Sequence, residues 1–196
     1  MSKIGAAILT GGQSSRMRQN KAFLTIGGKT FLEHITEQLS GFEEILLSVD
    51  DAEKYDHKDL ETITDMYPNC GPISGIYSAL RSCRSDYLLV LCCDMPLFTK
   101  DFAQYMTCFV DDYHDAFVLV TRSKYVLPLC AIYKKQVADI FEEQINAGIH
   151  RPLYALDKMR VRYILLGDST FQDDTVQGVN TPEEYDALLQ RMPKIL

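Results

Sequence analysis

The sequence predicts a three-layer α/β/α fold, in which a mostly parallel sheet is covered by helices on both faces. Short apolar runs alternate along the chain with segments of helical period, and no repeat or low-complexity linker interrupts them. The strongest runs are apolar at successive positions, so both faces of these strands are expected to be buried, as they are in a parallel sheet between two helical layers. The 196 residues are expected to form one domain, 1–196.

The predicted elements follow one another in a strand–helix order. Strands are expected at the apolar runs 4–9, 45–49, 87–93, 117–121, 129–133 and 161–165. Helices are expected at 30–39, 73–81, 100–110 and 136–147. Thr181 and Pro182 have the residue types of a helix N-cap and first position, so a further helix is expected there. In such sheets ligands bind beyond the carboxyl ends of the strands, which directs attention to the segments 9–22, 48–51 and 93–96, which are expected to converge.

Charge and composition exclude several classes of protein. The net charge is −7; five of the 20 cations and none of the 27 acids lie in residues 1–32, which leaves 15 cations against 27 acids in the rest of the chain. Such an acidic chain is a poor binder of nucleic acid or of an anionic membrane. No apolar run approaches the roughly 18 residues of a membrane helix and no signal peptide is evident, so a cytoplasmic protein is expected. The cysteines and histidines lack metal-ligand spacing and the thiols are interpreted as free and buried.

The loop "LTGGQSSRMRQNKA" (9–22) follows the first predicted strand and combines glycines with cations. It does not supply the Gly-x-Gly-x-x-Gly of a dinucleotide site. The later "GGKT" (27–30) is not a P-loop either, because Phe23 stands where the first glycine belongs, and it is interpreted as a turn into the next helix. Amides at Gly11 and Gly12 can approach phosphates closely, with Arg16 and Lys21 as fixed cations. A strand-to-helix turn with surface charges explains the same spacing equally well.

The segment "VLCCDMPL" places Asp94 at the end of the most apolar predicted strand, and Pro96 prevents the strand from continuing. A carboxylate there is a natural ligand for Mg²⁺, although an aspartate in this position is more often a turn residue. Together with the cationic glycine loop it becomes a candidate metal site. Asn180 lies just outside the predicted cap at Thr181 and is compatible with a role at the same metal.

These segments resemble a known family. The loop 9–22 is similar to the signature of the molybdenum cofactor guanylyltransferases, and "TDMYPNCGPISGI" (64–76), "CDMP" (93–96) and "VNTPEEY" (179–185) resemble three further motifs of that family, in the same order. The resemblance spans nearly the whole chain. Its first motif is shared with other sugar-phosphate and cofactor nucleotidyltransferases. Arg18 and Asn20 depart from the usual glycine and aspartate of that motif.

The resemblance implies a fold of the nucleotide-diphospho-sugar transferase type and a role for each matching residue. The implied GTP-binding residues are Leu9, Thr10, Gly11, Gly12, Lys21, Asp65 and Asp94. Among these Asp65 would contact the nucleoside, and the glycine pair favours GTP over CTP. The implied catalytic residues are Arg16, Lys21 and Asp94, with Arg16 and Lys21 on the phosphates. Mg²⁺ would be the cofactor, bound by Asp94 and Asn180.

The activity implied is transfer of GMP from GTP to molybdopterin with release of pyrophosphate. GTP and molybdopterin would be the substrates, and molybdoenzyme apoproteins and cofactor-insertion proteins are the partners expected from the family. The alternatives are a molybdopterin cytidylyltransferase, a sugar-phosphate nucleotidyltransferase, or a nucleotide-binding protein without catalysis. The acceptor is expected near residues 122–130, where Arg122 and Leu127-Pro128 stand in place of the arginine and His-Pro of many members.

Overall fold

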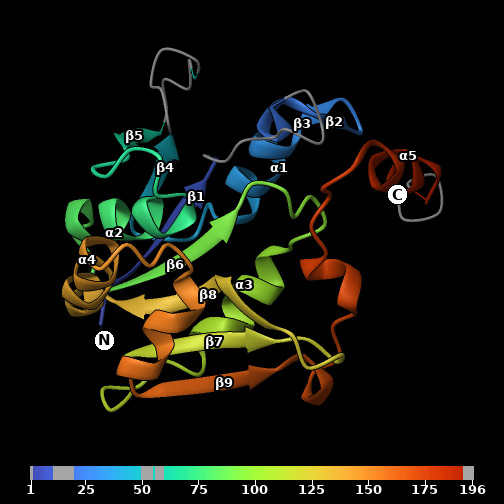
Figure 1. Cartoon of the computed structure of the whole chain (residues 1–196). Coiled ribbons are helices and arrows are strands. Elements are labelled where there is room, and N and C mark those ends of the chain that lie inside the picture. The colour runs from blue at the N-terminus through green and yellow to red at the C-terminus, as the bar shows by residue number, and fades with distance from the viewer. Residues whose placement is uncertain (1, 11–19, 50–54, 56–59, 192–196) are drawn as a thin grey trace.

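The computed structural model describes residues 2–10, 20–49, 55 and 60–191 of the chain and contains a seven-stranded sheet (Figure 1). The strands lie in the order β5-β4-β1-β6-β8-β7-β9. Their bounds are β1 Ile4–Leu9, β4 Ile45–Val49, β5 Glu61–Thr64, β6 Tyr87–Cys92, β7 Ala116–Val120, β8 Val126–Lys134 and β9 Val161–Leu165. Strands β5, β4, β1 and β6 run parallel, as do β7 and β9, whereas β8 is antiparallel to both β6 and β7. The prediction of a mostly parallel sheet is confirmed.

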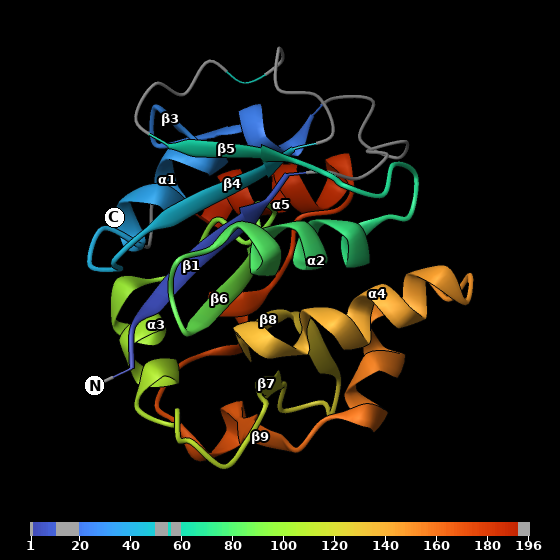
Figure 2. The same ribbon diagram turned by 90° about the vertical axis from the view of Figure 1, so that its left-hand side faces the viewer.

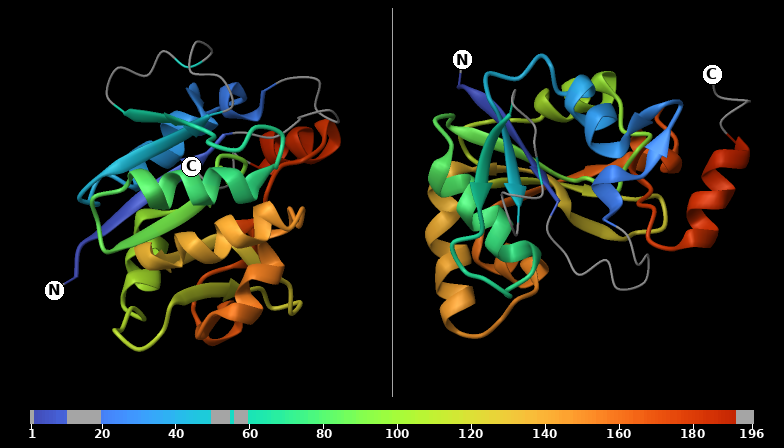
Figure 3. Two further views of the ribbon diagram at one scale, coloured as in Figure 1. Left: turned by 60° about the vertical axis from the view of Figure 1, so that its left-hand side comes forward. Right: turned by 90° about the horizontal axis from the view of Figure 1, so that it is seen from above.

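Helices cover both faces of this sheet (Figures 2 and 3). They are α1 Phe31–Gln38, α2 Pro72–Ser82, α3 Lys100–Thr107, α4 Ala138–Asn146 and α5 Pro182–Arg191, with short 3-10 helices η1 Lys21–Phe23, η3 Lys135–Val137, η4 Pro152–Lys158, η5 Leu166–Asp168 and η6 Asp173–Val176. Successive residues of β1 separate the two cores: Ala6 and Ile8 pack in the cluster that contains α1 and α3. Ala7 and Leu9 pack in the cluster that contains α2 and α4. This alternation confirms the three-layer arrangement.

The structure adds elements that the sequence pattern did not predict. A two-stranded hairpin, β2 Thr25–Ile26 and β3 Lys29–Thr30, turns at Gly27 and Gly28, both of which have positive φ. The "GGKT" segment is therefore a hairpin turn as well as the entry to α1, where Thr30 forms a capping box with Glu33.

Strand β8 is reversed because only five residues join it to β7, and a connection this short allows a hairpin but no crossover to a parallel strand.

Two further observations bear on the class of protein. In the described part of the chain, no helix combines the length and the apolar character that crossing a membrane requires. All six cysteines are free, as expected, but only Cys83, Cys93 and Cys130 are buried. Cys70 and Cys92 are partly exposed, and Cys108, at the C-terminal end of α3, is exposed.

Candidate active site

Three segments far apart in sequence meet at the ammonium group of Lys21. Its Nζ lies 3.0 Å from Asp94 Oδ2 and 2.6 Å from Asn180 Oδ1. Lys21 is the first residue of η1, Asp94 follows the end of β6, and Asn180 precedes α5. The side chains of Lys21 and Asp94 are only 17% and 12% exposed. The two predicted metal-binding residues therefore converge on one cationic group, which belongs to the predicted phosphate-binding lysine.

Backbone hydrogen bonds fix the Asp94 segment to the sheet and to the segment before α5. The amide of Cys93 donates to the Leu9 carbonyl at 3.0 Å, so pairing with β1 continues one residue past β6. The Asp94 carbonyl in turn accepts from the Val179 amide at 2.8 Å. Residues 177–180 are thereby held against the "CDMP" turn, which brings Asn180 beside Asp94.

Gly178 permits this close approach. A Cβ atom at position 178 would lie 3.2 Å from Asp94 Oδ1 and 3.1 Å from Asn180 Nδ2, closer than most side-chain contacts. The absence of a side chain therefore leaves room for the Asp94 carboxylate and the Asn180 amide together. No pattern around residue 178 indicated this role, because it depends on a segment more than 80 residues away.

A small third core holds the N-terminal end of α5 against the β2–β3 hairpin. The hydrophobic residues buried in it are Leu24, Ile26, Phe31, Val179 and Leu188. Tyr185 packs its ring edge-on to Phe31 at 5.9 Å and donates its hydroxyl to the Thr25 carbonyl at 2.6 Å. At the start of α5 the Glu184 amide donates to Thr181 Oγ1 at 3.2 Å, which agrees with the predicted cap.

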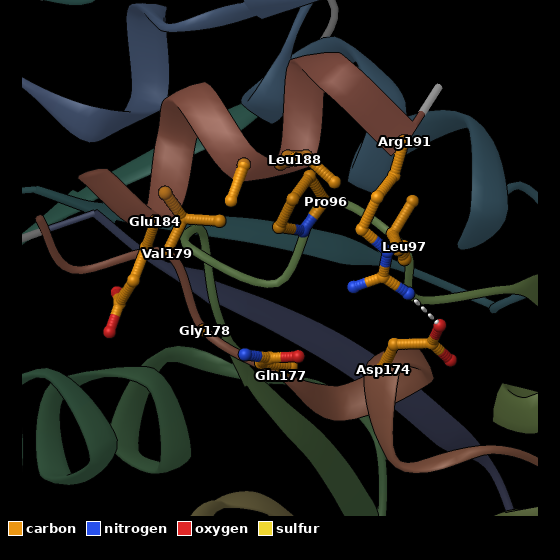
Figure 4. A pocket seen from close by; sticks show the side chains of 10 residues that line it. Pro96, Leu97, Asp174, Gln177, Gly178, Val179, Glu184, Leu188 and Arg191 are labelled. Atoms are coloured by element: carbon orange, nitrogen blue, oxygen red, sulfur yellow. Dashed lines mark hydrogen bonds and ion pairs between the residues drawn. The ribbon is translucent and has the colours of Figure 1, made fainter. Parts of the chain in front are cut away.

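A crevice of about 100 Å³ lies between the "CDMP" turn and α5 (Figure 4). Pro96 and Leu97 form one wall, Leu188 of α5 lies above them, and Gly178 belongs to the opposite wall. Arg191 closes one side by an ion pair with Asp174 at 2.6 Å. Lys21, Asp94 and Asn180 do not line the crevice, whereas Gly178 and Val179, which lie beside Asp94, do.

A second polar group lies beyond the ends of β1, β4 and β5. The hydroxyl of Thr10 donates to the Ser48 carbonyl at 2.9 Å, and the Ser48 hydroxyl donates to Asp65 Oδ1 at 3.1 Å. Gly75 allows α2 to lie close to the ends of β1 and β4, because a Cβ atom at position 75 would lie 3.0 Å from Ser48 Oγ and 3.2 Å from a methyl carbon of Leu9. Leu9, Thr10 and Asp65 are thus brought together. Sequence reasoning singled out the segments 48–51 and 64–76 but gave Ser48 and Gly75 no role in them.

The middle of the predicted phosphate loop lies outside the described residues, so the roles of Gly11, Gly12 and Arg16 stay predictions. The end of the loop is described. Asn20 is the N-cap of η1: its Oδ1 accepts from the Ala22 amide at 3.0 Å, while its Nδ2 donates to the Tyr55 hydroxyl at 2.7 Å. An aspartate would accept the first of these bonds in the same way, and in the second the Tyr55 hydroxyl would have to donate.

The predicted acceptor region is the hairpin between β7 and β8. Arg122 donates to the Phe171 carbonyl at 2.7 Å and lies 3.4 Å from Asp173, so its guanidinium ties the hairpin to the segment before η6. The Pro128 carbonyl accepts from the Tyr133 hydroxyl at 2.8 Å. Acceptor binding at these residues stays a prediction.

The cluster at Lys21 has the donor chemistry of a cation site. A carboxylate and an amide oxygen already face one ammonium group, which stands where a metal ion would compete for the same oxygens. Among the described residues, no three or more histidine, cysteine, aspartate and glutamate side chains gather to hold a metal on their own. Mg²⁺ is commonly bound by one or two carboxylates together with substrate phosphates. The residues fit such a shared site better than an all-protein metal centre.

The sheet order and the helices on both faces form an α/β fold of the nucleotide-diphospho-sugar transferase type, as the solved structures show. The structure is similar to that of molybdopterin-guanine dinucleotide biosynthesis protein A from Archaeoglobus fulgidus, with a TM-score of 0.81 and 24% identity over 97% of this chain and 99% of that one. A nucleotidyl transferase from Methanothermobacter thermautotroptrophicus superposes with a TM-score of 0.75 at 15% identity, over 99% of each chain.

Sequence relatives then define the family. A probable molybdenum cofactor guanylyltransferase from Clostridium perfringens strain 13 is 35% identical, over 97% of this chain and 98% of the relative, and the one from strain SM101 is 43% identical over the same shares. The family model described as the MobA-like NTP transferase domain matches residues 6–161. The chain belongs to this family of nucleotidyltransferases.

The substitution Gly178→Ala tests the close approach at the site. We expect nucleotidyl transfer to slow by about tenfold or more, because the added methyl group displaces Asp94 or Asn180 and misalignment by a fraction of an ångström is costly in catalysis. Thermal unfolding checks that the fold is retained. The control is Gly167→Ala, where a Cβ meets no atom within 4 Å. Equal activity of the two variants would show that the spacing at Gly178 is unimportant.

Proposed function

We propose that this protein transfers GMP from GTP to molybdopterin, forming the guanine dinucleotide cofactor and releasing pyrophosphate. The observation that carries the proposal is the contact of Lys21 with Asp94 and Asn180 at the carboxyl edge of the sheet. The names of the relatives, molybdenum cofactor guanylyltransferases at 35% and 43% identity over nearly the full length, support the choice of donor and acceptor. The proposal treats residues 1–196 as one nucleotidyltransferase domain.

The reaction needs charge compensation more than proton transfer. A phosphate monoester has a second pKa of about 6, so the acceptor phosphate of molybdopterin is largely a dianion at neutral pH. One of its oxygens forms a bond to the α-phosphorus of GTP as the bond from that phosphorus to the bridging oxygen of pyrophosphate breaks. No proton has to be removed from the nucleophile. The main barrier is the repulsion between two polyanions, which fixed cations and rigid alignment lower.

The proposed residues divide between the two ends of the nucleotide. Lys21 and Arg16 bind the phosphates, and Asp94 and Asn180 hold Mg²⁺. Asp65 contacts the nucleoside from the end of β5. The residues proposed to border the nucleotide along the first loop are Leu9, Thr10, Gly11 and Gly12. Mg²⁺, when bound, would neutralise phosphate charge beside the lysine.

Lys21 has to change partners when nucleotide and metal bind. Its ammonium now engages one oxygen of Asp94 and the amide oxygen of Asn180, the two atoms assigned to the metal. These two oxygens would hold a divalent ion, and its charge would then oppose that of the ammonium. The phosphates of GTP offer the lysine an alternative anion, so we infer that nucleotide binding releases the metal ligands. GTP and metal should therefore bind cooperatively.

The direct test is pyrophosphate release by the purified protein with Mg²⁺, GTP and molybdopterin, with CTP in parallel. Release that requires both GTP and molybdopterin supports donor, acceptor and reaction together. Release with CTP instead of GTP identifies a cytidylyltransferase. GTP binding without pyrophosphate release would mean that molybdopterin is not the acceptor or that the protein is not a catalyst. A cytoplasmic location stays a prediction from the sequence, and delivery of the product to molybdoenzyme apoproteins or cofactor-insertion proteins stays a prediction from the family.

The substitution Asp94→Ala should reduce turnover by at least about 100-fold, as is usual when one main electrostatic contact is removed. The variant should keep its fold, because Asp94 holds Val179 through its backbone carbonyl, which remains. Steady-state pyrophosphate release measures the effect. Asp101→Ala, which removes an exposed carboxylate in the first turn of α3, serves as the control and should behave like the unaltered protein. Normal turnover of the Asp94 variant would refute the metal assignment.

The substitution Lys21→Ala should weaken GTP binding by about tenfold or more, the size expected for a charge-assisted contact. Isothermal titration with a non-hydrolysable GTP analogue measures this affinity. Without nucleotide, Mn²⁺ should bind the variant more tightly than the unaltered protein, because the ammonium no longer competes for Asp94 and Asn180. Lys29→Ala is the matched control, since its ammonium pairs with Glu37 at 2.7 Å on an exposed surface. Unchanged GTP affinity would contradict the phosphate role of Lys21.

A further inference from the structure

The segment from Asp65 to Gly71 joins β5 to α2, and two buried serines of α2 fix its first part. The amide of Met66 donates to Ser78 Oγ at 2.8 Å, and that of Tyr67 donates to Ser74 Oγ at 3.1 Å. Both serine residues are 0% exposed. The backbone immediately after Asp65 is therefore tied to the helix.

The side chain of Tyr67 extends this connection to α4. Its hydroxyl donates to Glu142 Oε1 at 3.0 Å, and the hydroxyl of Tyr77 donates to the same oxygen at 2.7 Å. Arg81 donates to the other oxygen, Oε2, at 3.0 Å. The rings of Tyr67 and Tyr77 pack edge to face at 5.3 Å. Figures 1 and 3 show α2 and α4 side by side on this face of the sheet.

The pKa shifts of these groups agree with a carboxylate that accepts hydrogen bonds from two hydroxyl groups. Hydrogen bonds from Tyr77 and Tyr67 lower the pKa of Glu142, and the bond to Glu142 raises the pKa of Tyr67. Hydrogen bonds to an ionised acceptor are stronger than neutral ones. Tyr67 is thus held by a directional contact as well as by ring packing.

Asp65 is fixed from its other side by β4. Its amide donates to the Val49 carbonyl at 3.3 Å, and Oδ1 accepts from Ser48 at 3.1 Å. Beyond Tyr67 the chain reverses through positive φ at Asn69 and Gly71. The contacts of Asp65 itself to β4, together with those of Met66 and Tyr67 to α2 and α4, determine how this carboxylate is presented at the edge of the sheet.

We propose that Glu142, acting through Tyr67, is a positioning residue that orients Asp65 toward the nucleoside of GTP. The inference rests on the proposed function, because it takes Asp65 as the nucleoside contact. Glu142 does not itself contact the substrate in this proposal; it fixes a tyrosine two residues after the contacting carboxylate. Loss of the bond should therefore weaken nucleoside binding and leave the phosphate contacts and the transfer step unchanged.

Two tyrosine substitutions provide a matched test, because both remove a hydroxyl that donates to the same oxygen of Glu142. Tyr67→Phe alters the segment that carries Asp65, and we expect the Kd and KM for GTP to rise about fivefold with kcat unchanged within about twofold. Tyr77→Phe removes the other hydroxyl, which belongs to α2, and keeps the bond from Tyr67 to Glu142. It should lower the Tm at least as much, since Tyr77 is 6% exposed, and should leave GTP affinity unchanged. An equal loss of affinity in both variants would mean that the network serves packing alone.

Two further measurements locate the effect at the nucleoside. The affinity for inorganic tripolyphosphate, which lacks a nucleoside, should be the same in Tyr67→Phe and the unaltered protein; an equal loss for both ligands would overturn the inference. Asp65→Asn should weaken GTP binding, and adding Tyr67→Phe to it should cost less than Tyr67→Phe alone, because coupled residues are not additive.

These variants also separate the inference from the function on which it rests. If Asp65→Asn weakens GTP binding but Tyr67→Phe does not, only the positioning role of Glu142 fails. If Asp65→Asn leaves GTP affinity unchanged, the nucleoside contact fails and the inference fails with it. Additive losses in the double variant would place the effect of Tyr67 elsewhere than at Asp65.

Discussion

The contact of one ammonium group with two oxygens is the interaction on which the rest of this site depends. Asp94 and Asn180 lie 73 and 159 residues after Lys21 in the chain. The side chains of the lysine and the aspartate are largely shielded from water. Removing such charges from water is costly unless each is compensated. The charge of the lysine is compensated by its contacts with Asp94 Oδ2 and Asn180 Oδ1. Under the proposed function, a metal ion would replace the ammonium at these oxygens more readily once the phosphates of GTP offer the lysine another anion.

The position of Asn180 near the end of the chain depends on packing at a distance from the sheet. The Val179 amide bonds to the Asp94 carbonyl, and Val179 itself is buried with residues of the β2–β3 hairpin and α5. The hairpin immediately follows η1, which begins at Lys21. The same small core therefore determines the positions of the lysine and of the asparagine. A change in this core is expected to act on the site without any contact to the substrate.

The sequence could predict those elements whose residues carry their own signal. The bounds of β1, β4 and β9 are the predicted ones, and β6 differs by one residue, because runs apolar at successive positions mark strands with buried faces. Strand β5 was missed, because three of the four residues in its "ETIT" sequence are polar and the strand lies at the sheet edge. Asp94 and Lys21 could be proposed from their places in the loops. Their mutual contact, the role of Gly178 and the bond from Tyr67 to Glu142 could not, because each depends on residues distant in sequence.

The strand order explains why two separate supports are needed. Asp65 follows β5 and Asp94 follows β6, and β4 and β1 lie between these strands. Under the proposed function the nucleoside and the phosphates therefore occupy opposite sides of the end of β1. The nucleoside side is supported by α2 and α4 through Tyr67, whereas the phosphate side is supported by the hairpin and α5. Because these supports belong to different packed clusters, substitutions can alter recognition of the nucleoside without altering the charge compensation on which transfer depends.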